Sequence, residues 1–181
     1  DRAVQPALEQ FRRDIAPATV RICRFHRPMT YAHGLAYALS FARGDVLFIS
    51  HDMELTPACV EALLAAAKLD ESIGVIRPTS QHMDWANKLA VAPPPGITAL
   101  DPLCRFASEV RKHFQDDIVD WPILIGDAMF IKRSVIDRIG TFDPRFVGFM
   151  GAIDYGLRVG RPGFRQVIAR RARLSHQGHA T

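Results

Sequence analysis

Cysteine is scarce in this chain, and its spacing excludes the common cysteine-based sites. The 181 residues contain three cysteines, Cys23, Cys59 and Cys104, none of them in a Cys-x-x-Cys pair. Such a pair is the usual sequence mark of a zinc site or a redox centre. We therefore predict reduced thiols in a cytoplasmic protein.

Long hydrophobic runs and strong charge are missing as well. No apolar run approaches the roughly 20 residues of a membrane-spanning helix, and no signal peptide is visible. The formal charge is only +4, with one dense basic group at Arg170, Arg171 and Arg173. Basic and aromatic residues are not interleaved on one element, so we predict no nucleic-acid partner; the mild charge suits anionic small ligands. Peripheral contact with a membrane stays open.

The remaining composition is that of an ordinary globular domain. Hydrophobic residues make up 48% of the chain and charged residues 23%, which is enough apolar material for a sizeable core. No internal repeat or low-complexity tract is present. We therefore predict a single domain over residues 1–181.

The most informative stretch is GDVLFISHDMELTP, Gly44–Pro57. Its apolar run Val46–Ile49 is β-branched or aromatic at three of four positions, which is typical of a parallel strand buried on both faces. Thr56 can cap the helix that follows, and Pro57 suits its first position. A polar cluster therefore lies at the carboxyl end of a strand, where open α/β sheets bind ligands. The cluster consists of Ser50, His51, Asp52 and Glu54.

Periodicity elsewhere predicts alternating helices and strands, and hence an α/β layered domain. Helices are expected at Asp1–Ile15, Met29–Phe41, Ala58–Leu69, Asp101–Phe114, Ser134–Ile139 and around Asp154 and Arg158. Strands are expected at Thr19–Phe25, Val46–Ile49, Gly74–Arg77, Ile123–Lys132 and Arg165–Leu174. The polar segment Thr79–Pro95 predicts a long loop, which is either functional or a plain Pro-rich connector.

Three blocks in the right order carry a family resemblance. Thr30–Pro57 is similar to an Ala-x-Gly-(Asp/Glu) start of a strand with an Asp-x-Asp-like end. Gly126–Phe146 is similar to a Gly-x-x-(Met/Phe)-x-x-(Lys/Arg) strand, a helix and a Gly-x-Phe-Asp turn. Asp154–Arg165, followed by His176, is similar to an Asp-Leu-x-x-Arg helix, a Gly-Tyr/Phe strand and a late histidine. Together they resemble the family 2 glycosyltransferases, whose nucleotide-sugar-binding fold is called GT-A.

The resemblance implies a fold and an activity. The fold would be an α/β, GT-A-like (Rossmann-like) three-layer sandwich with a mostly parallel central sheet. The activity would be the inverting, metal-assisted transfer of a sugar from a nucleotide-diphosphate donor to a hydroxyl acceptor. The acceptor would be a glycan, a lipid-linked molecule or a small molecule. Residues 1–78 would form the donor part and 79–181 the acceptor side. The implied setting is cell-surface polysaccharide biosynthesis, in the cytoplasm or at the inner face of the membrane.

Three residues are candidate ligands for Mn²⁺ or Mg²⁺. A cation held by carboxylate oxygen offsets the charge that develops on a departing diphosphate. Asp52 is the main candidate, since Ser50 occupies the usual place of the motif's first acid. Glu54 assists, or merely sits near a helix N-terminus. The resemblance places a metal-contacting histidine near His176, and imidazole suits manganese; simple exposure near the C-terminus is the alternative.

Candidates for catalysis and substrate binding follow from the same chemistry. An inverting transfer requires a base on the acceptor hydroxyl, and Asp154 is the best available acid; an i, i+4 ion pair with Arg158 is the competing explanation. Both hold together if Arg158 keeps Asp154 ionised and helps bind substrate. His51 would contact phosphate or sugar, or simply pack, and Trp85 would stack on a sugar ring, or pack. Asp127 would hold the acceptor or donor sugar.

Two departures from the family pattern support a second hypothesis. Family members usually begin with a strand-helix-strand unit, and Asp1 and Arg2 resemble the residues just after it, so the domain is expected to be N-terminally incomplete. The acids that usually precede the Asp-Leu-x-x-Arg helix fall at Gly151 and Ala152. Both features favour a catalytically degenerate GT-A-like domain that binds a glycan or a partner protein. A nucleotidyltransferase would need a Gly-rich phosphate loop, which the sequence lacks.

Overall fold

A computed structural model describes residues 4–114, 118–123 and 128–177 of the chain. The helices are α1 Val4–Asp14, α2 Tyr31–Leu39, α3 Pro57–Ala67, α4 Leu100–His113, α5 Arg133–Ile139 and α6 Met150–Gly160, with a 3-10 helix at Asn87–Leu89. The strands are β1 Val46–Ile49, β2 Met53–Glu54, β3 Ile73–Thr79, β4 Ile118–Asp120, β5 Ala128–Ile131, β6 Arg165–Arg173 and β7 Ser175–His176.

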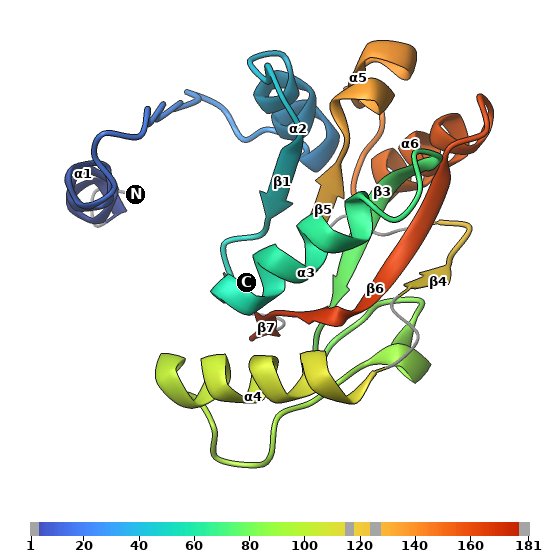
Figure 1. Ribbon diagram of the computed structural model, residues 1–181. Helices are drawn as coiled ribbons and strands as arrows, with labels where there is room; N and C mark the ends of the chain where they lie inside the picture. The colour runs from blue at the N-terminus through green and yellow to red at the C-terminus, as the bar shows by residue number, and fades with distance from the viewer. Residues whose placement is uncertain (1–3, 115–117, 124–127, 178–181) are drawn as a thin grey trace.

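The central sheet is mixed and has five strands in the order β1-β5-β3-β6-β4. β3 and β6 pair in parallel, whereas β5 pairs antiparallel with both β1 and β3, and β4 pairs antiparallel with β6. Three strands, β1, β3 and β6, therefore run in one direction. A second, two-stranded sheet joins β2 to β7. Helices lie on both faces of the central sheet (Figure 1), so the α/β three-layer architecture is confirmed.

Alternation along the strands produces two cores. On β5, Met129 and Ile131 belong to the core beneath α2, α5 and α6. Ala128 and Phe130, on the same strand, belong to the core beneath α3. Because successive side chains of a strand point to opposite faces, this four-residue segment supports both helical layers. Helix α4 packs beside α3 against β6.

Helix caps form where the sequence places them. The Thr56 hydroxyl accepts the backbone N–H of Cys59 at 3.2 Å, and Pro57 occupies the first turn of α3. Helix α5 ends at Gly140, whose φ of 78° favours glycine. None of the helices in the described part of the chain has the length and hydropathy needed to cross a bilayer.

Two expectations about strands were wrong. Thr19–Phe25 forms no strand; it runs as unpaired backbone from α1 to α2 (Figure 1), because among the described residues no strand lies beside it to complete a ladder. Val46–Ile49 does form β1, but at the edge of the sheet and antiparallel to β5 rather than buried on both faces. Ile49 is 39% exposed. The short edge strand β4 was not anticipated.

Candidate functional site

A small two-stranded sheet brings the two main metal candidates together. The chain leaves β1 at Ile49, turns, and pairs β2 with β7, so that Met53 lies opposite His176. The backbone N–H of Gln177 donates to the carbonyl of Asp52 at 3.0 Å. Asp52 and His176, which are 124 positions apart, therefore meet at the carboxyl end of β1.

The side chains of Asp52 and His176 are in direct contact. Nε2 of His176 lies 3.2 Å from Oδ2 of Asp52, and the two side chains are only 13% and 11% exposed, respectively. The other ring nitrogen, Nδ1, lies 3.3 Å from the backbone carbonyl of His82. A carbonyl only accepts, so this contact assigns the proton to Nδ1. With the proton on Nδ1, the lone pair of Nε2 points at the Asp52 carboxylate. This contact is favourable when Nε2 also carries a proton or when a cation lies between the two groups.

The Asp52 carboxylate is ionised and partly unsatisfied. Burial raises its pKa, but the nearby Ser50 hydroxyl, the Asp52 backbone N–H and the charge of His176 together outweigh burial, so that the pKa lies below its usual value. The second oxygen, Oδ1, is buried and has no hydrogen-bond partner in the described structure. Because buried polar atoms are normally paired, an orphan carboxylate oxygen beside an imidazole suits the binding of a divalent cation.

The other predicted residues of the polar cluster do not complete a metal centre. Glu54 instead accepts a hydrogen bond from Nε2 of Gln177 at 3.3 Å. Within residues 4–114, 118–123 and 128–177, no group of three His, Cys, Asp or Glu side chains is placed to hold a metal. His51 is exposed in the turn after β1. The described chain thus offers two ligands, Asp52 and His176.

Two residues that the sequence reasoning missed hold this site in place. The side-chain oxygen of Gln81 accepts the backbone N–H of His176 at 3.1 Å and Nη2 of Arg173 at 2.9 Å. Arg173 is 1% exposed and also donates to the carbonyl of Leu174 at 2.6 Å. Burial lowers the pKa of Arg173 to about 10. Its only sequence signal was its place in the basic group Arg170, Arg171 and Arg173.

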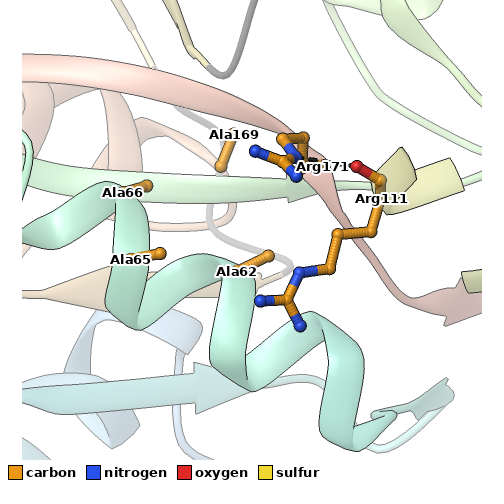
Figure 2. A pocket seen from close by; sticks show the side chains of 6 residues that line it. All are labelled: Ala62, Ala65, Ala66, Arg111, Ala169 and Arg171. Atoms are coloured by element: carbon orange, nitrogen blue, oxygen red, sulfur yellow. Dashed lines mark hydrogen bonds between the residues drawn. The ribbon is translucent and has the colours of Figure 1, made fainter. Parts of the chain in front are cut away.

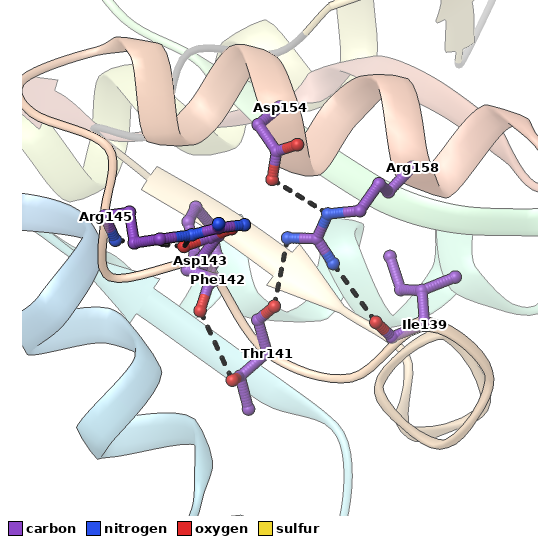
Figure 3. A network of polar contacts seen from close by, with 7 residues as sticks. All are labelled: Ile139, Thr141, Phe142, Asp143, Arg145, Asp154 and Arg158. Carbon is purple, nitrogen blue, oxygen red and sulfur yellow. Dashed lines mark hydrogen bonds and ion pairs between the residues drawn. The ribbon is translucent and has the colours of Figure 1, made fainter.

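Asp154 lies in an ion-pair network next to the turn after α5 (Figure 3). Its Oδ2 accepts Nε of Arg158 at 2.8 Å, which confirms the predicted i, i+4 pair. Arg158 also donates to the carbonyls of Ile139 and Thr141 at 3.1 and 3.0 Å, so it ties α6 to that turn. Both side chains of the pair are 22% exposed. This anchoring accounts for the pair structurally, and a base role for Asp154 stays a prediction.

The same turn carries a second ion pair. Arg145 donates to both oxygens of Asp143, and these hydrogen bonds lower the pKa of Asp143 to about 2. Figure 3 shows the guanidinium of Arg145 beside this carboxylate, next to the Asp154–Arg158 pair.

The missing acids of α6 have a packing explanation. A Cβ at Gly151 would lie 2.6 Å from the Cβ of Ala32 on α2, closer than van der Waals contact allows. Ala152 is 2% exposed within the core that α2, α5 and α6 cover. Side chains as large as an acid at these positions would require α2 and α6 to separate.

The substrate-binding candidates are placed differently. Trp85 is 55% exposed and meets the Phe149 ring edge-to-face, with the centroids 5.9 Å apart. Asp127 lies outside the described residues. A hollow between α3, α4 and β6 (Figure 2), lined by Arg111, Arg171 and small alanine side chains, has a volume of about 30 Å³. That is room for water and not for a nucleotide, so it is not the donor site.

Comparison with known proteins supports one fold. No family model matches the chain. An N-acetylglucosaminyl-diphospho-decaprenol L-rhamnosyltransferase of Mycobacterium tuberculosis, found in strains CDC 1551 / Oshkosh and ATCC 25618 / H37Rv, is 26% identical over 149 residues, covering 75% of this chain and 48% of the relative. The chain therefore spans about half the length of the curated relatives it matches.

Two solved structures match nearly the whole of this chain. The mannosyltransferase PcManGT from Pyrobaculum calidifontis, in complex with GDP-Man and Mn²⁺, superposes with a TM-score of 0.63 at 20% identity, covering 96% of this chain and 44% of that one. GalNAc-T7 with UDP, GalNAc and Mn²⁺ gives 0.68 at 12% identity, covering 97% and 35%. This chain has the GT-A fold. The resemblance implied by the three sequence blocks is confirmed, and the Asp52–His176 pair is the candidate site of this GT-A domain.

Proposed function

We propose that this GT-A domain is part of a glycosyltransferase that transfers a sugar from a nucleotide-diphosphate donor to a hydroxyl acceptor with inversion and with the help of Mn²⁺ or Mg²⁺. The observation that carries the proposal is the buried, unpaired Oδ1 of Asp52 beside Nε2 of His176. The relatives and structural neighbours are glycosyltransferases by name, and two of the structures contain Mn²⁺.

In this proposal Asp52 and His176 hold the cation. A carboxylate oxygen and an imidazole nitrogen suit Mn²⁺, and the His82 carbonyl would orient the imidazole through Nδ1. Two protein ligands are enough when substrate phosphates and water supply the remainder, as is usual for phosphate-bound divalent cations. When bound, such an ion offsets negative charge on the departing diphosphate.

Both parts of the chain would then contribute to one site. Asp52 comes from the donor part, residues 1–78, whereas Gln81 and His176 come from residues 79–181, the proposed acceptor side. On the acceptor side, Asp154 is the proposed base, kept ionised by Arg158. His51, Asp127, Trp85 and Arg158 are proposed substrate contacts, with Glu54 as an outer support of the cation site.

The acceptor we favour is lipid-linked. The curated relative is named for a diphospho-decaprenol-linked substrate. A lipid-linked acceptor would bring the enzyme to a membrane surface as a peripheral protein on the cytoplasmic side, in the assembly of a cell-surface polysaccharide.

The test is metal-dependent hydrolysis of nucleotide sugars, a side reaction that needs only the donor half of the site. The wild-type protein should hydrolyse at least one nucleotide sugar with Mn²⁺, and Asp52→Asn and His176→Ala should each reduce the rate by about 100-fold or more. Asp101→Asn, which neutralises an exposed carboxylate on α4, is the matched control. Normal turnover by Asp52→Asn would exclude the proposed role of this carboxylate.

A second candidate function is a degenerate GT-A domain that binds a glycan without turnover. The packing of Gly151 against Ala32, which leaves no room for the family's usual acids, favours it. Calorimetry with a nucleoside diphosphate separates the two functions: heat that requires Mn²⁺ and disappears in Asp52→Asn supports the transferase, whereas glycan binding without any such heat supports the degenerate domain.

A further inference from the structure

An exposed apolar rim lies near the candidate site. It consists of Trp85, Val147, Phe149 and Met150, whose exposed fractions are 55%, 70%, 54% and 46%. The rings of Trp85 and Phe149 meet edge-to-face, which joins the loop after β3 to the start of α6. Single exposed hydrophobic residues are normal on a protein surface, whereas several that lie together usually mark a binding surface.

The backbone holds Trp85 outward at an energetic cost. Trp85 has a φ of 62°, a conformation that a bulky residue rarely adopts, and it is the one non-glycine residue with positive φ in the described chain. Its neighbours are fixed: Nη1 of the buried Arg77 donates to the carbonyl of Asp84 at 3.1 Å, and the N–H of Ala86 donates to the carbonyl of Met83 at 3.0 Å. Met83 and Ala86 are buried while the indole between them is exposed. Strain concentrated at one exposed aromatic is a sign of function rather than of packing.

The rim is close to the proposed cation ligands. The His82 ring lies edge-to-face with His176 at 5.9 Å between centroids, and His176 contacts Asp52. Trp85 follows His82 by three residues, so their Cα atoms are at most about 11 Å apart. A molecule whose reactive end lies at Asp52 and His176 can therefore extend over Trp85 and Phe149.

The chemistry of the rim favours a hydrocarbon. The segment Val147–Met150, with sequence VGFM, offers no polar side chain for sugar hydroxyls. A hydrocarbon chain requires only apolar surface, and each buried methylene contributes about 0.8 kcal/mol. We propose that Trp85, Val147, Phe149 and Met150 bind the isoprenoid chain of a lipid-linked acceptor. This inference rests on the proposed function and specifies the substrate class of its acceptor side.

Tryptophan fluorescence tests the inference directly. The chain has two tryptophans, so in a Trp121→Phe background Trp85 is the only reporter. Titration with farnesyl phosphate below its aggregation limit should shift the Trp85 emission to shorter wavelength and saturate. Phe149→Ser and Met150→Ser, in the same background, should each weaken binding by about tenfold, since each removes apolar contact area. The matched control is Leu64→Ser, which changes a 44% exposed leucine on α3, on the opposite face of the sheet; binding should be unchanged.

Other ligands define the outcomes that overturn the inference. A saturable shift with methyl glucopyranoside but none with farnesyl phosphate would assign the rim to a sugar ring. A shift with phosphatidylglycerol vesicles but none with monomeric farnesyl phosphate would assign it to the membrane surface. An equal response to inorganic phosphate would show that only the headgroup is bound.

Nucleotide-sugar hydrolysis, measured on the same proteins, keeps this inference separate from the proposed function. Hydrolysis that depends on Asp52, without any farnesyl phosphate binding, refutes the isoprenoid site alone. Binding of farnesyl phosphate without hydrolysis supports the rim as an isoprenoid site and counts against sugar transfer.

Discussion

The Asp52 carboxylate combines burial, a negative charge and an unpaired oxygen, and these properties make its behaviour testable without a substrate. A ligand that binds only the folded state stabilises it by mass action, by about 2.7 kcal/mol at a concentration 100 times its Kd. Saturating Mn²⁺ should therefore raise the melting temperature of the wild-type protein by several degrees. The rise should vanish in His176→Ala. An equal rise in both proteins would place the Mn²⁺ site elsewhere.

The lowered pKa of Asp52 predicts how stability depends on pH in the absence of metal. A carboxyl whose folded pKa lies below its ordinary value of 3.8 stabilises the fold above that pH, and the contribution is lost as pH falls through the folded pKa. As the pH falls below about 5, wild type should therefore lose stability more steeply than Asp52→Asn does. Urea unfolding of both proteins across this range measures the difference. Parallel curves would show that Asp52 has the same pKa folded and unfolded.

Arg173 supports the geometry of the site through Gln81, which accepts hydrogen bonds from both Arg173 and His176. It is a buried cation that donates to the backbone carbonyls of Val91 and Leu174 and to the side-chain oxygen of Gln81. Arg173→Met keeps the volume but leaves these acceptors unpaired, so unfolding free energy should fall by about 2 to 4 kcal/mol. Guanidinium unfolding measures it, with the exposed Arg105→Met on α4 as control. A loss below about 0.5 kcal/mol would show that water replaces the guanidinium.

At the scale of elements, the contact between α2 and α6 limits what α6 can carry. Alanine is favoured over glycine inside a helix by about 1 kcal/mol. Gly34 on α2, with open space around it, should follow that rule, so Gly34→Ala should be stabilising. Gly151→Ala should instead destabilise by about 1 to 3 kcal/mol, because its Cβ would overlap that of Ala32.

The double mutant Ala32→Gly, Gly151→Ala isolates that contact. It should recover most of the loss, since the only new overlap is removed, and the coupling energy from the cycle should be about 1 kcal/mol or more. Additive effects would mean that the helices shift apart at little cost, and the absence of the family's acids would then have no packing cause.

Local signals explain which elements the sequence predicted. Helices α2 to α5 lie within two residues of the expected ranges, and α6 carries Asp154 and Arg158 as expected, because periodicity, Thr56 with Pro57, and Gly140 act over one or two turns. The strands were less certain because pairing is not local. Thr19–Phe25 has the composition of a strand but has no described partner, and β4 is recognisable only through its ladder with β6.

The residues of the site likewise divide into those with a local sequence signal and those that depend on distant partners. Asp52 follows a recognisable strand, and the family resemblance pointed to His176, so both were predicted before their contact was known. Gln81 and Arg173 escaped prediction, since their roles depend on hydrogen bonds between residues 92 or more positions apart. The strained φ of Trp85 has no sequence signal at all.

At the scale of the whole molecule, the first helix contributes nothing to the two cores of the sandwich. Helix α1 has no buried residue and lies apart from the sheet, joined to α2 by an unpaired segment (Figure 1). Removing residues 1–18 should therefore change the unfolding free energy by less than about 0.5 kcal/mol, as for other changes outside a core. Leu35→Ala, at a leucine on α2 that is 4% exposed, should cost about 2 to 5 kcal/mol in the same denaturant assay.

Limited proteolysis gives an independent test of whether the sandwich is stable without α1. Arg21 and Arg24 are exposed in unpaired backbone, so trypsin should cut there before it cuts any arginine of β6. The fragment that begins at Ile22 or Phe25 should keep the cooperative melting transition of the intact chain. The transition could instead be lost on cleavage, or the truncation could lower the unfolding free energy by more than about 1 kcal/mol. Either result would show that α1 packs on the sandwich in solution and that the segment between α1 and α2 contributes to stability.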